Sequence, residues 1–370
     1  MVLKQIDLQN FRLHKNTSLE FSDKLNLVIG GNGQGKTSIL EAIYYLCTTK
    51  NLNLAVENDV VAFGESYFDA RGKFSDLADN TTRIYFDAVK NKKAFFVDDK
   101  QIFSSASVIG KFPIVSLVQA DHAITLGAPS DRRRFVDSVI SQASHAYLEM
   151  ILDYGKTLRQ RSSLLAQIKE SRNRNLFDQL DAWTDSLIIS GSEIIKHRMR
   201  FVNEFNLYLH EAYNNIIENK EEPLINYAPL HDVTEDNIAE KFREEINAAR
   251  EDELRRAVNL IGPHRDDFIF SISDLELKRF GSQGQHKTFQ IALRFAQFFF
   301  IKEKLGKTPL FLMDDVFGEL DTYRAGRISE YLSEIGQAFI TLTDLTKTEG
   351  LNIRGENILI KVSNGTAAVA

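Results

Sequence analysis

The sequence has 370 residues, of which 43% are hydrophobic and 26% are charged, and its formal net charge is −6. This composition is ordinary for a globular protein of two or three domains or lobes. The acidic balance weighs against a surface coated in basic residues for nucleic acid, although a local basic face needs only local positive potential. The most apolar segment, 289–301, is interrupted by Gln290, Arg294 and Gln297 and is too short to span a membrane.

The N-terminus and the cysteine content bear on the compartment. Residues 1–14 alternate and carry charges, so they predict a strand and not the apolar core of a secretory signal. The single cysteine, Cys47, cannot form an internal disulfide, which fits a reducing compartment. We therefore expect a cytoplasmic protein without a membrane segment.

Strands dominate the first third of the chain and helices the middle. Up to about residue 125, short apolar runs alternate with turns, and the expected strands are 2–8, 16–21, 25–29, 67–74, 82–89 and 94–97. Between 130 and about 219, apolar residues recur at every third or fourth position, which predicts helices interrupted by the polar stretch 170–175. The later elements are a loop or edge strand over 221–232, a helix over 235–259, a strand over 268–272, a helix over 286–303 and a strand over 309–315.

A glycine-rich loop, GGNGQGKTS at Gly30–Ser38, fits the phosphate-binding pattern G-x-x-x-x-G-K-[ST]. It lies between the expected strand 25–29 and a helical pattern over 38–46, so a glycine-rich turn that binds nothing is the weaker interpretation. The backbone N–H groups of such a loop surround phosphate oxygens, Lys36 adds a charge, and Thr37 offers a hydroxyl to Mg²⁺. The predicted nucleotide-binding residues here are Gly30, Asn32, Gly33, Gly35, Lys36, Thr37 and Ser38.

A second phosphate-site element is the apolar strand 309–313, which ends in Asp314 and Asp315. We expect Asp314 to hold Mg²⁺ together with Thr37, and Asp315 to orient or deprotonate the attacking water, with Lys36 as the other catalytic residue. The alternative is a buried strand with acids at its exposed end. Because the two elements lie far apart in the chain, the helical middle is inserted into one nucleotide-binding lobe, and the expected divisions are 1–125, 126–258 and 259–370.

The sequence Ser282-Gln283-Gly284-Gln285 begins the helix expected over 286–303 and supplies a second helix N-terminus suited to an anion. An economical explanation for two such termini is that Ser282, Gly284 and Gln285 face the γ-phosphate of ATP held by a second subunit. That arrangement is a head-to-tail dimer with ATP between the subunits. The alternative is a simple cap on a core helix.

Taken together, these motifs resemble the ABC-type ATPase core, with 282–285 as its signature motif and 318–321, including the nucleotide-binding Asp321, as the loop that crosses the dimer interface. Within that superfamily the chain closely resembles the RecF DNA recombination and repair family. The matching segments are 8–12, 30–46, 127–137 (GAPSDRRRFVD), 262–268 (GPHRDDF) and 314–321. Of these, 127–137 and 262–268 are more specific to the family than the ATPase motifs.

The resemblance implies an α/β fold: an ABC-type ATPase head with a mixed sheet around the phosphate loop, antiparallel N-terminal strands and an inserted helical lobe. It also implies a cytoplasmic protein with ATP and Mg²⁺ as cofactors that forms an ATP-dependent homodimer and hydrolyses ATP slowly, stimulated by DNA. Its expected partners are duplex DNA near single-strand gaps or at junctions with single-stranded DNA, together with RecR, RecO and RecA.

Several residues carry less specific predictions. Gln119 is the expected metal-sensing glutamine, although the run 117–122 departs from the family pattern. The strand 338–344 lacks the histidine of many ABC ATPases, which together with aspartate at 315 indicates slow turnover. Arg12 either reaches the nucleotide or forms a surface salt bridge.

Two basic segments have alternative interpretations. The run Arg132-Arg133-Arg134 either contacts DNA phosphates or pairs with acids such as Asp131 and Asp137. The segment 264–266 is expected to be a turn-forming loop and not a kinase catalytic loop, since the asparagine of that motif is missing.

Two other functions compete with DNA repair. An SMC-type chromosome ATPase needs hundreds of residues of heptad coil, whereas the stretch from Arg134 to Gly262 fits only a compact helical lobe. The nucleotide-binding subunit of a membrane transporter normally has a much shorter stretch between phosphate loop and signature.

Overall fold

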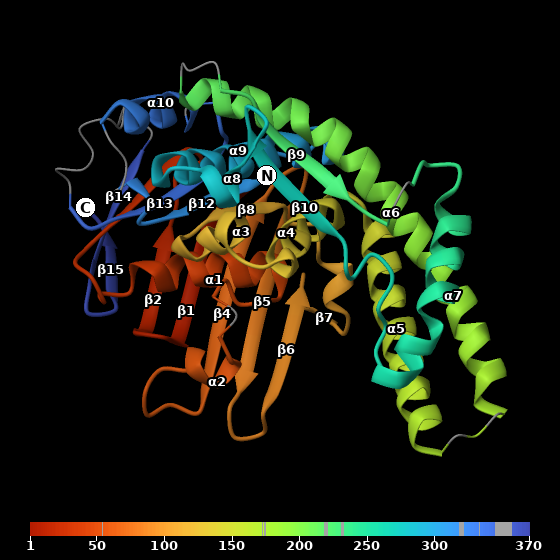
Figure 1. The fold of residues 1–370 in the computed structure, drawn as a ribbon. Helices are drawn as coiled ribbons and strands as arrows, with labels where there is room; N and C mark the ends of the chain where they lie inside the picture. Colours follow the sequence, from red (N-terminus) through yellow and green to blue (C-terminus); the bar gives the residue numbers. More distant parts are fainter. Residues whose placement is uncertain are drawn as a thin grey trace. The chain divides into compact units, whose positions relative to one another are not determined.

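The computed structural model describes residues 1–53, 55–171, 173, 175–217, 221–230, 233–317, 322–332, 334–344 and 357–370. The chain forms two compact units (Figure 1). Unit 1 contains Met1–His122, Glu211–Lys220 and Lys287–Ala370, and unit 2 contains Ala123–His210 and Glu221–His286. The expected division of the chain at residues 125 and 258 stays a prediction.

Unit 1 contains an antiparallel six-stranded sheet in the order β2-β1-β4-β5-β6-β7. Its strands alternate between buried apolar and exposed polar side chains, as expected of a sheet with one face on a core. The bounds are β1 Val2–Phe11, β2 His14–Glu20, β4 Tyr67–Ser75, β5 Asp79–Asp87, β6 Lys92–Val97 and β7 Lys100–Ile102. The predicted N-terminal strands are therefore confirmed.

The second sheet of unit 1 has the order β15-β14-β3-β13-β12-β8, and all its pairs are parallel except β14 with β15. Its strands are nearly continuous apolar runs, which is typical of buried parallel strands. The bounds are β3 Leu25–Ile29, β8 Ile114–Leu117, β12 Leu310–Asp314, β13 Ala338–Leu342, β14 Ile358–Ser363 and β15 Thr366–Val369. Since β3, β12 and β13 run in one direction, their carboxyl ends meet at one edge, where ligands bind in such sheets.

The core of unit 1 lies between the two sheets around α1 (Lys36–Thr48). Its fully buried Ile39, Leu40 and Ile43 join side chains from both sheets, such as Phe68 and Leu312. The other helices of this unit are α2 Glu57–Val60, η1 Ser105–Ser107, η2 Gln119–Asp121, α10 Thr322–Leu332 and the larger part of α9 Gln283–Leu305. Burial of α1 on all sides fixes the position of the loop that precedes it.

Unit 2 is mainly helical, as the spacing of apolar residues predicts. Its helices are α3 His122–Leu126, α4 Pro129–Ala143, α5 His145–Ser171, most of α6 Asn175–Ile216, α7 Ile238–Arg256 and α8 Leu277–Phe280. The break between α5 and α6 coincides with the polar stretch 170–175, and Leu164, Leu165, Ile168 and Leu180 form a buried cluster beside it.

A three-stranded antiparallel sheet in the order β11-β10-β9 completes unit 2. The bounds are β9 Pro223–Ala228, β10 Asp267–Ile272 and β11 Leu275–Glu276. The edge strand expected near Pro223 is confirmed as β9. The Asn206 side chain of α6 donates to the carbonyl of Ile225 and accepts from its N–H, both at 2.9 Å, so it satisfies part of the open edge of this strand. Within the described residues, no helix is long and apolar enough to cross a membrane.

Candidate active site

The loop between β3 and α1 is folded around the side chain of Lys36. The Lys36 Nζ donates to the carbonyl oxygens of Gly30 at 2.7 Å and Gly31 at 2.9 Å, and the side chain is buried. Gly33 and Gly35 have φ angles of 72° and 108°, which glycine adopts without strain. Asn32 and Gly33 are exposed, and Thr37 and Ser38 lie in the first turn of α1. The predicted residues therefore form one loop whose N–H groups lie at a helix N-terminus, an arrangement suited to phosphate.

Thr37 and Asp314 meet at the carboxyl edge of the parallel sheet, although 277 residues separate them in sequence. The Thr37 hydroxyl lies 3.0 Å from both carboxylate oxygens of Asp314. On the other side, the Thr341 hydroxyl donates to Asp314 Oδ1 at 2.7 Å. Burial raises the pKa of Asp314, and the charge of Asp315 adds to this, while the Thr341 and Thr37 hydrogen bonds oppose it. A bound cation would offset the cost of burying this carboxylate.

Asp315 lies just beyond the end of β12 with a φ angle of 52°, an uncommon conformation for a residue other than glycine. Its N–H donates to the Thr341 Oγ1 at 2.8 Å. The same hydroxyl therefore fixes both acids, accepting from one backbone and donating to the other carboxylate. In the sequence, Thr341 belongs only to the expected late strand, and no local pattern predicts this role.

Two turns support the phosphate loop from the side. The His14 Nε2 lies 3.0 Å from the carbonyl oxygen of Gly35, and burial lowers the pKa of His14, so the neutral ring donates this hydrogen bond. From the β14–β15 hairpin, the Asn364 N–H donates to the Gln34 Oε1 at 2.6 Å and the Gly365 N–H donates to the Gln34 carbonyl at 3.0 Å. None of these contacts has a local sequence signal.

Arg12 is held by an ion pair. Its Nε and Nη2 donate to the two carboxylate oxygens of Glu41 at 2.8 and 2.7 Å, and its Nη1 donates to the Asp59 carbonyl at 2.7 Å. Glu41 is only 2% exposed, so this is a partly buried bridge and not the surface salt bridge expected as the alternative. A contact between Arg12 and the nucleotide stays a prediction.

Gln119 begins the 3₁₀ helix η2 beyond β8. It lines a small pocket together with His122, Gln290 and Val316, the residue that follows Asp315. The adjacent Asp121 pairs with Arg294 of α9, and both side chains are largely buried. The predicted metal-sensing glutamine thus lies on a segment anchored to the helix that follows the signature sequence.

The signature sequence forms the start of α9. The Gln285 N–H donates to the Ser282 Oγ at 3.2 Å, the Ser282 N–H donates to the Gln285 Oε1 at 2.9 Å, and the Gln285 Nε2 donates to Glu221 at 3.0 Å. These bonds form a reciprocal cap, which is the simpler of the two predicted roles. Gly284 is the second residue of the helix, and Asp321 lies outside the described residues.

The two segments most specific to the family pattern join each other in unit 2. Arg132 is 7% exposed, and its Nε and Nη2 donate to the two carboxylate oxygens of Asp267, both at 2.8 Å. The Arg133 Nη1 donates to the Asp266 carbonyl at 2.5 Å, whereas Arg134 is exposed and pairs with Asp131. Two of the three arginines therefore pair with acids, as the acid-pairing alternative predicts: Arg134 pairs with the expected Asp131, and Arg132 pairs with Asp267.

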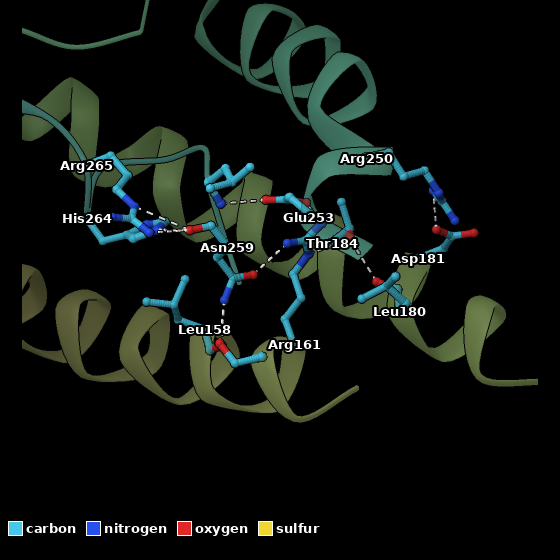
Figure 2. Close-up of polar contacts among 12 residues, drawn as sticks. Leu158, Arg161, Leu180, Asp181, Thr184, Arg250, Glu253, Asn259, His264 and Arg265 are labelled. Carbon is cyan, nitrogen blue, oxygen red and sulfur yellow. Dashed lines mark hydrogen bonds and ion pairs between the residues drawn. The ribbon is translucent and has the colours of Figure 1, made fainter. Parts of the chain in front are cut away.

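Buried polar networks surround the loop 259–267. Arg198, 3% exposed, pairs with Asp137 and Asp266, and donates to the Pro263 carbonyl at 2.7 Å. Figure 2 shows the neighbouring network, in which Arg161 of α5 bonds to Thr184 of α6, Glu253 of α7 and Asn259. The segment 264–266 is thus the expected turn-forming loop, tied to α4 by Arg133, to α5 by Tyr154 and to α6 by Arg198.

Comparison with known proteins agrees with this geometry. A family model described as the RecF/RecN/SMC N terminal domain matches residues 2–358. The DNA replication and repair protein RecF of Chloroherpeton thalassium is 38% identical over 353 residues, which cover 93% of this chain and 95% of that protein.

Solved structures give the same result. One described as the recombination mediator protein RecF-ATP in the RecFOR pathway superposes with a TM-score of 0.90 at 30% identity, covering 100% of this chain and 97% of that chain. An SMC head bound to the C-terminal winged-helix domain of ScpA covers 100% of this chain and 97% of that chain, with a TM-score of 0.60 at 13% identity, and shows a shared fold alone.

Proposed function

The chain belongs to the RecF family of DNA replication and repair proteins, and on this premise we propose that it is an ATP-controlled DNA-binding protein of recombinational repair. It binds ATP as a recombination mediator and hydrolyses it slowly. Its DNA is duplex next to a single-strand gap or at a junction with single-stranded DNA, and its partners are RecR, RecO and RecA, in the cytoplasm.

The contact between Thr37 and Asp314 carries the ATPase part of the proposal. An oxygen-only donor set at the end of a phosphate loop suits Mg²⁺, which prefers oxygen ligands and substrate phosphates. Thr37 and Asp314 would hold the ion, with Gln119 as a further candidate, and the ion would neutralise charge on the phosphates. Lys36 and the N–H groups of the loop bind the phosphates, and Asp315 accepts a proton from the attacking water or orients it.

The second part of the proposal is an ATP-dependent homodimer. Ser282, Gly284 and Gln285 of one subunit face the nucleotide held by the phosphate loop of the other, with Asp321 at the interface. The start of α9 supports this, because the reciprocal cap fixes the helix N-terminus and the positive end of the helix dipole favours an anion there. ATP and DNA binding are then coupled only if DNA has a higher affinity for the closed dimer than for the open form.

The test is fluorescence anisotropy of a labelled duplex containing a single-strand gap, titrated with protein in Mg²⁺-ATP, Mg²⁺-ADP or no nucleotide. Binding that requires ATP supports the proposal. Equal binding in all three conditions contradicts the coupling, and the absence of binding in every condition contradicts the DNA-binding function. Lys36→Ala should lose ATP binding and DNA binding together.

A further inference from the structure

Three cationic side chains of unit 2 are held by backbone carbonyl groups and not by carboxylates. The Arg133 Nη1 donates to the Asp266 carbonyl at 2.5 Å, the Arg265 Nη2 to the Asn259 carbonyl at 2.9 Å, and the Lys278 Nζ to the Gly127 carbonyl at 2.9 Å. Among the described residues, none of these three side chains has an ion-pair partner. Each is oriented but keeps its full charge.

The carboxylates nearby are already paired with other arginines. Asp267 is bound by Arg132, and Asp266 and Asp137 are bound by the buried Arg198. Burial, together with the charges of Arg265 and Arg133, lowers the pKa of His264 to about 4, and the hydrogen bond to Asn259 opposes this shift. The positive potential at this loop is therefore not cancelled locally.

The three cations are attached to one framework. Arg133 is bonded to the residue that follows Arg265, and the Gly127 carbonyl that accepts from Lys278 also accepts from Arg132 at 3.1 Å. Figure 2 shows the Arg265 side chain directed, with His264, at the carbonyl of Asn259. Because a guanidinium has five N–H donors and Arg133 uses one of them, donors remain for a ligand.

We propose that Arg133, Arg265 and Lys278 form a contact surface for the phosphodiester backbone of duplex DNA. This inference rests on the proposed function and names the surface that performs it. Phosphate oxygens are good acceptors for fixed guanidinium and ammonium groups, and less conformational entropy is lost on binding when these donors are already oriented. Such contacts supply affinity and register without reading sequence, so the interaction depends on salt and not on the base pairs.

The experiment compares two triple variants that lose the same charge. In one, Arg133, Arg265 and Lys278 are replaced by glutamine. In the control, Arg134, Arg255 and Arg279 are replaced by glutamine. These side chains lie in the same unit and are 66%, 69% and 73% exposed, and each is paired with a carboxylate three residues away. Affinity for gapped duplex is measured by anisotropy in Mg²⁺-ATP over a series of salt concentrations, with two unrelated duplex sequences.

We expect the first variant to lose about tenfold or more in affinity and about 3 units in the slope of log affinity against log salt, since each lost phosphate contact removes about 0.9. The loss should be equal for both sequences, and the control variant should keep the wild-type slope. The exposed Lys278→Gln alone, which breaks a single hydrogen bond, should lower the slope by about one. It therefore tests the proposal even if the triple variant does not fold.

Three outcomes overturn the inference. If the two triple variants bind alike while the wild type binds DNA, the surface is elsewhere and the proposed function stands. If the first variant loses ATP-dependent dimerisation, measured by light scattering, the cations contact the second subunit or its nucleotide instead of DNA. If the wild type binds no DNA in any nucleotide condition, the proposed function and this inference fail together.

Discussion

Arg132 and Asp267 form a bidentate ion pair in which both N–O distances are 2.8 Å. This pair joins the segments 127–137 and 262–268. The arginine is 7% exposed and the aspartate 30% exposed. These are the segments that identify the family in the sequence, and the pair gives a structural reason for their joint occurrence. It holds the first turn of α4 against the start of β10.

Replacing Arg132 by alanine should destabilise unit 2 by about 2–3 kcal/mol, because the partly buried Asp267 loses its partner. The only tryptophan, Trp183 in α6, reports on this unit, so urea unfolding followed by its fluorescence measures the change. Arg134→Ala, at a 66% exposed position, should cost less than about 1 kcal/mol. Equal effects of the two changes would contradict the assigned roles.

The stability of unit 2 should fall between pH 7 and pH 5 through His264. Burial, with the nearby arginine charges, lowers the pKa of this residue from 6.5 to about 4. The unfolded state therefore binds more protons in this range, and stability is lost as pH falls below 6.5, by about 2 kcal/mol at pH 5. His264→Gln should show a smaller loss over the same range in urea unfolding followed by Trp183, and identical pH profiles would exclude His264 as the cause.

Thr341→Val removes the hydroxyl that bonds to both Asp314 and Asp315. The pKa of Asp314 should rise further without the Thr341 bond, and both acids lose their fixed positions. We expect ATP hydrolysis to slow about tenfold and to need more Mg²⁺, with a stability loss of about 1–2 kcal/mol. Thr341→Ser keeps the hydroxyl and should retain activity; a serine variant as slow as the valine variant would point to packing instead.

Gly365→Ala tests whether the C-terminal hairpin positions the phosphate loop. The added methyl group would lie 2.0 Å from the Leu13 carbonyl oxygen, so the turn that bonds to Gln34 must move. Nucleotide affinity should fall about tenfold, measured by titration with a fluorescent ATP analogue. Gly306→Ala is the matched control, since its φ angle of 62° is also left-handed but its added methyl group meets no atom within 4 Å. Equal affinities would show that the turn is not needed.

Asp315→Asn should keep ATP binding and slow hydrolysis about 100-fold, the range typical of a lost general base. On the proposed coupling, the closed dimer then persists and DNA dissociates more slowly. A stopped-flow dissociation measurement from gapped duplex in Mg²⁺-ATP decides this. DNA release as fast as from the wild type would contradict the clamp, while unchanged hydrolysis would remove Asp315 from the mechanism.

Local patterns in the sequence predict the elements of the site well but not their supports. The strand, loop and helix around Lys36 and the acid pair after β12 have fixed spacing and flanking apolar runs, so both are recognisable without a structure. Thr341, His14 and Asn364 act on residues from distant segments, and nothing in their neighbourhood distinguishes them.

The three adjacent arginines illustrate the same limit. Their sequence predicts positive charge but does not say which side chain is buried, because this depends on where Asp267 lies in the fold. Arg132 takes the carboxylate of Asp267, while Arg133 has no ion-pair partner in the described part of the chain, and only the structure separates the two.

The hydrogen bonds from the β14–β15 turn to Gln34 also determine when the site is complete during synthesis. The Asn364 N–H is 330 residues beyond the Gln34 side chain that it contacts, and β14 pairs directly with β3. A ribosome that has translated the phosphate loop must therefore make most of the chain before the loop gains its last support. Nascent chains are expected to have low nucleotide affinity until the hairpin has left the exit tunnel, so partly made copies would bind little ATP while finished copies bind it.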